Sequence, residues 1–351
     1  WLRTCTTSHE ECRGLANKTP SFAPDRLVEI STNDEGESFM WRLVCPADIG
    51  NVQYLTLSHC WGLSPHTSLT RDNYSAFLEP TPDSELPKTF RHALSITFSL
   101  GFHFIWIDSL CIVQDDQKDW ETQASMMGSV YKHASCNIAA TWAADGDDGC
   151  LVPRKPWTMT LNHELGQLDE YLVTHSYPYQ ENIWEAPLNK RGWVAQERFL
   201  AKKQLSFAKD QVYWECKELV ASEQFPEGPP RELGHTFHVM ASRSSDELRK
   251  PTLDFTVEAE RRKAWSELVN FYSDCKLSKM SDKLIALAGL AEEMRLATGD
   301  YYLAGLWKKD LEKQLCWNTT VQPGRRHKVN RSRIPYYLAP SWSWASLDGP
   351  V

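Results

Sequence analysis

The sequence predicts an α/β fold in which a central, mainly parallel sheet is flanked by helices. Between Gln53 and Trp142, short apolar runs that suit buried strands alternate with segments of helical periodicity. Helices placed between such strands act as crossovers, which bring successive strands into one parallel sheet. The remainder of the chain indicates an additional β-rich and helical C-terminal extension.

The core elements are expected at residues 53–58 (strand), 86–101 (helix), 102–108 (strand), 120–133 (helix) and 135–142 (strand). In the first helix, Pro87 fixes the first turn and Gly101 can end the last one. Residues 102–131 are the most informative stretch, because an apolar run ends there in Asp108 and a polar loop follows. Open α/β sheets place their ligands at such strand ends.

Beyond this alternation the pattern changes. Strands of antiparallel character are expected at residues 171–175, 204–208 and 211–216, helices at 192–201, 256–275 and 281–297, and a strand at 342–346. Residues 225–234 are rich in proline and glycine and suit a linker. We expect an N-terminal Cys/His segment (1–45), an α/β core (46–224) and an extension packed on the core (225–351).

Composition narrows the classes of function. The net charge is −8 and no long basic run occurs, so the sequence predicts no nucleic-acid partner. No apolar stretch reaches the ~20 residues that span a bilayer, so no membrane span is expected. The sequence therefore favours a soluble, cytoplasmic protein whose ten cysteines are mostly buried, reduced thiols. Fifteen tryptophans suit a packed interior and aromatic-lined pockets.

A first candidate site lies where two expected strands end. His59 and Trp61 follow the first strand, and Asp108, Cys111 and Gln114 follow the second. If these strands are parallel neighbours, their ends lie about 5 to 10 Å apart. Asp108 and His59 are then candidates for proton transfer, and His59 could activate Cys111 as a nucleophile. The alternative for Cys111 is a buried structural thiol.

A second candidate cluster combines Arg191, Trp193, Glu197 and Arg198. Either arginine can hold a phosphate or carboxylate by a planar two-point contact, and Glu197 can take part in proton transfer. The alternative is an internal salt bridge from Arg191 or Arg198 to Asp108, Asp119 or Glu197, which would lock the ends of the sheet.

Two further patterns have both structural and functional interpretations. Asp119 and Glu121 lie in the first turn of an expected helix, where Asp119 suits an N-cap. Near the C-terminus, strand alternation would put Trp342 and Trp344 on one face. That face is either a packed aromatic edge or a wall for a flat ligand.

The N-terminus carries a possible metal site. Cys5, His9 and Cys12 form a C-x3-H-x2-C pattern of zinc-type ligands. A fourth ligand, such as Cys45 or Cys150, could complete a tetrahedral structural zinc site if the chain folds back. The alternative is a helical or loop segment that packs on the core without metal.

Several blocks resemble the signatures of the fungal heterokaryon-incompatibility (HET) domain family. They are YLTLSHCWG (54–62), LPKTFRHAL (86–94), IWIDSLCIVQDD (105–116), DW (119–120) and MGSVY (127–131). Further blocks in the same order are RGWVAQERFLAKKQLSF (191–207), DKLIALAGLA (282–291), YYLAGLW (301–307) and APSWSWASLDG (339–349). The resemblance covers most of the chain and implies a TIR/flavodoxin-like core, since HET domains are distantly similar to TIR (Toll/interleukin-1 receptor) domains.

Some TIR domains cleave NAD with a glutamate on the helix after a central strand, and many HET sequences have a glutamate three residues after the DW tryptophan. Here that position is Gln123. A glutamine cannot stabilise an oxocarbenium-like charge as a carboxylate does, nor act as a general base. Glu121 is near in sequence but points about 160° away on a helix. The glutamine at position 123 therefore argues against the NAD hydrolase activity that the resemblance implies.

The resemblance implies a protein of fungal non-self recognition and regulated cell death, with NAD as candidate ligand or substrate. Self-association is also implied, because TIR-like domains generally act after assembly. Two alternatives remain open on the residues alone. One is a stand-alone small-molecule enzyme, for example in secondary metabolite biosynthesis, that uses the Asp/His/Arg/Glu crevice. The other is a non-catalytic interaction module in which those polar residues are structural.

Overall fold

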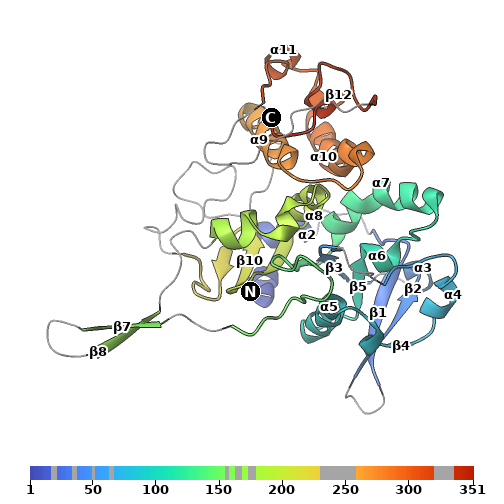
Figure 1. Ribbon diagram of the computed structural model, residues 1–351, viewed down its shortest axis with the longest axis vertical. Coiled ribbons are helices and arrows are strands. Elements are labelled where there is room, and N and C mark those ends of the chain that lie inside the picture. Colours follow the sequence, from blue (N-terminus) through green and yellow to red (C-terminus); the bar gives the residue numbers. More distant parts are fainter. Residues whose placement is uncertain are drawn as a thin grey trace.

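One large mixed β-sheet organises the protein (Figure 1). The computed structural model describes residues 1–16, 22–33, 38–49, 52–62, 67–154, 158–162, 168–172, 179–229, 258–319 and 336–351. The nine strands of the sheet run in the order β11-β10-β9-β6-β3-β5-β1-β2-β4. They are β1 (Leu27–Thr32), β2 (Phe39–Val44), β3 (Leu55–Ser58), β4 (Thr81–Pro82), β5 (Phe104–Ile107), β6 (Cys136–Ala139), β9 (Lys203–Phe207), β10 (Val212–Cys216) and β11 (Val220–Ser222).

The centre of this sheet is parallel and its two edges are antiparallel. Strand β3 pairs in parallel with β5 and β6, and β6 pairs in parallel with β9. The remaining neighbours, from β5 through β1 and β2 to β4 and from β9 through β10 to β11, are antiparallel. The expected mainly parallel, flavodoxin-like sheet is therefore corrected to a mixed sheet. The short connections between β1 and β2 and between β9, β10 and β11 allow hairpins but no crossovers.

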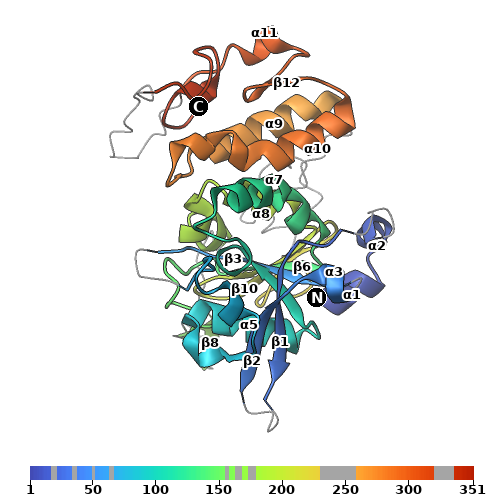
Figure 2. The same ribbon diagram turned by 90° about the vertical axis from the view of Figure 1, so that its right-hand side faces the viewer.

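Helices cover both faces of the sheet. Figure 2 shows α7 and α8 on one side of it and α5 on the other. The helices are α1 (Leu2–Thr7), α2 (Glu10–Ala16), α3 (Pro46–Ile49), α4 (Tyr74–Phe77), α5 (Lys88–Ser99), α6 (Asp108–Cys111), α7 (Gln117–His133), α8 (Val194–Leu200), α9 (Glu258–Ser273), α10 (Ala288–Thr298) and α11 (Leu311–Gln314). Strands β3, β6 and β10 are buried along their whole length, as strands covered on both faces should be.

Helix α7 begins three residues before the expected Trp120. The side chain of Asp116 accepts hydrogen bonds from the backbone N–H groups of Lys118 and Asp119, so Asp116 is the N-cap. Asp119 was the expected cap, and this assignment was wrong. Its carboxylate instead lies 2.6 Å from the guanidinium of Arg26.

The C-terminal extension differs from its prediction in two places. Residues expected to begin a helix at 281 form two short 3₁₀ turns, Met280–Lys283 and Ile285–Leu287, before α10. The expected strand at 342–346 was wrong, because Trp344–Ser346 is a 3₁₀ turn capped by the Ser343 hydroxyl. Trp344 is 1% exposed whereas Trp342 is 41% exposed, so the two rings do not form one wall.

Two small hairpins lie outside the large sheet. They are β7 (Thr158–Asn162) with β8 (Leu168–Leu172), and β12 (Tyr302–Leu303) with β13 (Leu306–Trp307). The strand expected at 171–175 overlaps the end of β8, and its last three residues lie outside the described residues. Of the expected linker, residues 230–234 also lie outside them. Among the described residues, no helix has the length and apolar character to cross a membrane.

The extension packs against the core through a close helix contact (Figure 2). A Cβ at Gly289 of α10 would lie 3.0 Å from the Cα of Gly128 in α7 and 2.2 Å from Oε1 of Gln196 in α8. The backbone N–H of Gly289 donates to that same oxygen at 2.7 Å. Lys132 and Glu293 add an ion pair at 2.7 Å between α7 and α10. Glycine is thus required at this crossing.

Substituting Gly289→Ala should destabilise the protein by about 1–3 kcal/mol, because the added methyl group forces α10 away from Gln196. Urea unfolding measured by circular dichroism would test this. The control is Leu296→Ala, on the same helix at a side chain that is 63% exposed, which should change stability by about 0.5 kcal/mol or less. Equal effects of the two substitutions would contradict the tight packing.

Candidate functional site

A cavity of about 480 Å³ opens where β3 and β5 end, and it is called the crevice below. Cys60, Trp61 and Gly62, which follow β3, line it together with Asp108, which follows β5. Because these strands are parallel neighbours, their carboxyl ends meet at the same edge of the sheet. The expected convergence of the two strand ends is therefore present.

Aromatic and apolar side chains form much of the crevice. Trp61, Trp120 and Trp193 line it, and the rings of Trp120 and Trp193 meet edge to face with centroids 6.2 Å apart. Ile112 and Met127 add apolar surface. Flat, partly exposed indole rings suit a ligand with a ring of its own.

Positive charge borders the same space. Arg191, whose side chain is 24% exposed, lines the crevice together with the exposed Lys276 and Lys279. Lys276 reaches this position because its backbone pairs with the segment around Arg191. The N–H of Gly192 donates to the carbonyl of Lys276, and the N–H of Lys276 donates to the carbonyl of Lys190, both at 2.7 Å.

Asp108 is the polar centre of the crevice. Its Oδ1 accepts a hydrogen bond from the backbone N–H of Ser109 at 2.7 Å, and its Oδ2 accepts one from Nε1 of Trp61 at 3.0 Å. Nδ1 of His59 lies 3.7 Å from Oδ1, and Nη2 of Arg191 lies 4.0 Å from Oδ2. The carboxylate thus lies among donors and positive charges at the surface of the crevice, where its oxygens can also accept hydrogen bonds from a ligand.

Arg191 joins Asp108 to a second, deeper carboxylate. Its Nη1 lies 3.5 Å from Oε1 of Glu197 and donates to the backbone carbonyl of His59. Burial opposes the positive charge of Arg191, but Glu197 and Asp108 outweigh it and raise the pKa of the guanidinium. Glu197 is 1% exposed, and this burial raises its pKa although Arg191 opposes the rise. The salt bridges expected as an alternative for Arg191 are thus present.

The predicted site residues fall into two groups. Those that line the crevice are Trp61, Asp108, Gln114, Arg191 and Trp193, while His59, Cys111, Glu121, Glu197 and Arg198 do not line it. The side-chain amide of Gln114 donates to the backbone carbonyls of Asp108 and Ile112, at 3.2 and 3.0 Å, and so fixes the loop after β5.

The side chains that do not line the crevice have other partners. The thiol of Cys111 is fully buried, and burial raises its pKa to about 12, which disfavours a thiolate at neutral pH. Arg198 pairs with the buried Glu215 at 2.6 Å. Glu121 is exposed and accepts a hydrogen bond from Gln117 at 2.8 Å. Gln123 is 2% exposed and donates to Asp25 at 2.8 Å.

The side of the crevice that the extension provides was not predicted from the sequence. Lys276, Leu277, Ser278, Lys279 and Asp282 all line the cavity. They follow α9 and carry no motif, and only the folded chain brings them beside Arg191. The glycine at position 192 is the nearest sequence feature that indicates this contact. A Cβ at Gly192 would lie 2.4 Å from the side chain of Leu277, so a larger residue would not fit.

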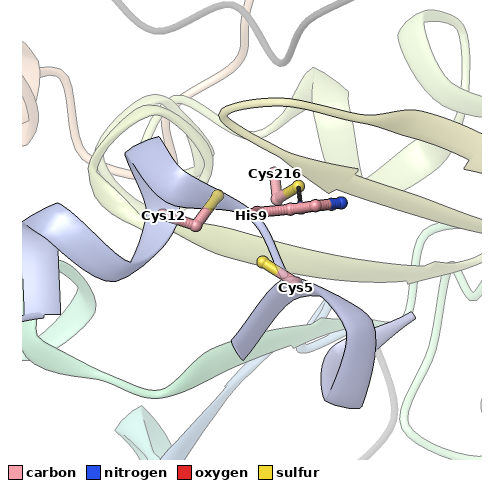
Figure 3. A group of neighbouring side chains, drawn as sticks. All are labelled: Cys5, His9, Cys12 and Cys216. Atoms are coloured by element: carbon pink, nitrogen blue, oxygen red, sulfur yellow. Dashed lines mark hydrogen bonds between the residues drawn. The ribbon is translucent and has the colours of Figure 1, made fainter. Parts of the chain in front are cut away.

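The N-terminal Cys5, His9 and Cys12 lie together, as their spacing predicted, and none of them lines the crevice. Their fourth neighbour is Cys216 at the end of β10 (Figure 3). The expected fourth ligand, Cys45 or Cys150, was therefore wrong. Cys216 follows a run of buried strand residues, so its sequence context resembles that of an ordinary core cysteine.

The fold and the crevice define an α/β protein with a small-molecule-sized cavity at the carboxyl edge of its parallel strands. Residues 54–197 match the family model described as heterokaryon incompatibility protein (HET). The expected HET resemblance is confirmed over these residues, which include Asp108, Arg191 and Glu197. The quoted residues after 197, which include the end of the block 191–207 and all later blocks, lie outside the match. No curated protein and no solved structure matches the chain.

Substituting Asp108→Asn should lower the free energy of unfolding by about 1–3 kcal/mol, because it removes the charge facing Arg191 and turns an amide toward existing donors. Chemical denaturation would measure the change. The exposed Asp147→Asn is the matched control and should be neutral within about 0.5 kcal/mol. An unchanged stability in Asp108→Asn would mean that Asp108 has no structural role.

Glu197 should make stability depend on pH in a defined direction. Its pKa is raised in the folded state, so the unfolded chain ionises first, above its ordinary value of 4.5. The contribution of Glu197 to stability is therefore fully present below this pH and is lost as pH rises through the folded pKa. Glu197→Gln, compared with wild type by urea titration at several pH values, should remove this decline. Parallel curves for the two proteins would exclude the shift.

Proposed function

We propose that the protein acts in the cytoplasm in fungal non-self recognition and regulated cell death, and that its crevice binds a nucleotide, with NAD as the first candidate. The HET match supports the biological role. The single observation that supports the ligand is the crevice itself, which combines three tryptophan rings with Arg191, Lys276 and Lys279 in a volume of about 480 Å³.

The crevice offers complementary groups for each part of a nucleotide. Indole rings stack on a base or a nicotinamide ring, and cations at the border attract phosphates. The carboxylate oxygens of Asp108 can accept hydrogen bonds from ribose hydroxyls. A mostly apolar lining with a few charged groups is typical of small-molecule sites.

Hydrolysis of NAD is a narrower proposal, and it would depend on Asp108. An oxocarbenium-like transition state needs a nearby carboxylate, and Asp108 lies at the polar centre of the crevice. Glu121 is exposed outside the crevice, and Gln123 is engaged with Asp25. Binding is therefore better supported than cleavage.

Nucleotide binding can be measured by isothermal titration with NAD. Lys276→Gln and Lys279→Gln should each weaken binding roughly two- to fivefold, because each removes one exposed cation at the border. Trp120→Leu should weaken it by about tenfold through loss of a stacking ring. The control is Lys263→Gln on α9, an exposed lysine outside the crevice, which should bind like wild type.

Nicotinamide release, followed by chromatography, separates a binder from a hydrolase. Incubation at low and at high protein concentration would also test the self-association implied by TIR-like proteins. Release that is lost in Asp108→Asn, while that variant still binds NAD, would support the hydrolase. Binding without release would favour a ligand-sensing HET domain, and the absence of both would count against the nucleotide proposal.

A second candidate function uses the same space. Ile112, Ala124 and Met127 give part of the crevice an apolar surface, which also suits a flat, weakly charged molecule. A small-molecule enzyme, for example in secondary metabolite biosynthesis, would then use Asp108 as its polar group. Quenching of tryptophan fluorescence by small aromatic acids, in a protein that fails to bind NAD, would support this alternative.

A further inference from the structure

Four potential metal ligands converge at the N-terminal end of the chain. Cys5 comes from α1, Cys12 from α2, His9 from the turn between them, and Cys216 from the end of β10 (Figure 3). Their sulfur and nitrogen atoms all lie within 4.8 Å of one another. Nδ1 of His9 is 3.3 Å from Sγ of Cys216, although these residues are 207 positions apart in sequence.

The arrangement is close to the geometry of a tetrahedral zinc site. With Zn–S bonds of about 2.3 Å, neighbouring sulfurs in a tetrahedron lie about 3.8 Å apart. The observed upper bound of 4.8 Å therefore requires a contraction of about 1 Å at most. Three cysteines and one histidine are a common ligand set for structural zinc.

Burial and the surrounding contacts hold the four side chains in place. Cys5 and Cys216 are fully buried and Cys12 is 7% exposed, whereas His9 is partly exposed and leaves a route from solvent. The carboxylate of Glu218, just after β10, accepts hydrogen bonds from the backbone N–H groups of Glu11 and Cys12, at 2.5 and 3.3 Å.

The tryptophan at the start of the chain makes an independent contact with the same region. The ring of Trp1 stacks on Trp214 of β10 with centroids 6.5 Å apart. Its Nε1 donates to the backbone carbonyl of Pro226 at 2.7 Å. The N-terminal segment therefore contacts β10 and the residues after β10 and β11 through groups other than the four potential ligands.

We propose that Cys5, His9, Cys12 and Cys216 bind one zinc ion that fastens the N-terminal helices to the β10–β11 edge of the sheet. Four protein ligands leave no open position for water, so the ion is structural rather than catalytic. Short helices of six and seven residues are marginal alone, which makes an anchor of this kind effective. None of the four residues lines the crevice, so the site is separate from the proposed function.

The metal content of the wild-type chain is the first test, since it needs no variant. Protein purified without chelators should contain about one zinc per chain by inductively coupled plasma mass spectrometry. After zinc removal under reducing conditions, added Co²⁺ should give the thiolate charge-transfer and visible bands of a tetrahedral sulfur-rich site. Absence of zinc together with absence of these bands would overturn the proposal.

Variants then assign the ligands. Cys216→Ser and Cys5→Ser should each reduce bound zinc from about one per chain to near zero. The matched control is Cys316→Ser, because Cys316 is an exposed free thiol outside the cluster. Equal zinc loss in the control would overturn the assignment. A disulfide between two of the cluster cysteines would also overturn the assignment. The test is non-reducing mass spectrometry on protein that was purified and stored under reducing conditions.

The anchoring role has its own readout. In wild type, a chelator should speed hydrogen exchange and proteolysis within residues 1–16 at least tenfold, and zinc should reverse the effect. NAD binding should stay unchanged, so failure of the nucleotide proposal and failure of the zinc proposal can be told apart. Unchanged exchange in residues 1–16 after zinc removal would contradict the anchoring role.

Discussion

The crevice depends on the contacts that the guanidinium of Arg191 makes with the segments around it. The guanidinium contacts the backbone after β3 through His59, the carboxylate after β5 through Asp108, and α8 through Glu197. The backbone beside it pairs with Lys276 of the extension. A planar cation with several donors can hold these three segments at once, whereas a single ammonium group could not. The negative charges beside it keep the arrangement electrically balanced in a poorly solvated place.

The parallel centre of the sheet and the antiparallel pair of β9 and β10 could be predicted from sequence, and the antiparallel pairing of β1 and β2 could not. Apolar runs that end in polar residues identify β3, β5 and β6, and the periodic segments between them identify α5 and α7. The strands β1 and β2 lie within the expected Cys/His segment, yet they join the same sheet. Strand direction there depends on long-range pairing, which no local pattern encodes. At Trp342 and Trp344 a local contact overrode the strand pattern. The Ser343 hydroxyl caps a 3₁₀ turn, although the alternation of residues predicts a strand.

The candidate site shows the same division. Asp108, Trp61 and Arg191 could be found because each lies at an end of a recognisable element, and the structure brings them together. The burial of each side chain could not be predicted from the sequence, since it depends on how other segments pack against it. Cys111 and Glu197 thus proved to be buried, and Cys216 was invisible as a partner of Cys5 because nothing local distinguishes it from other core thiols.

Two parts of the chain line the crevice, and only one of them matches the HET family model. The charged centre of the crevice belongs to the region that matches the HET model, whereas residues 276–282 approach from outside that match. If the crevice binds the proposed nucleotide, residues on both sides of the matched boundary would determine which ligand fits, because Lys276 and Lys279 line it together with Asp108 and Arg191.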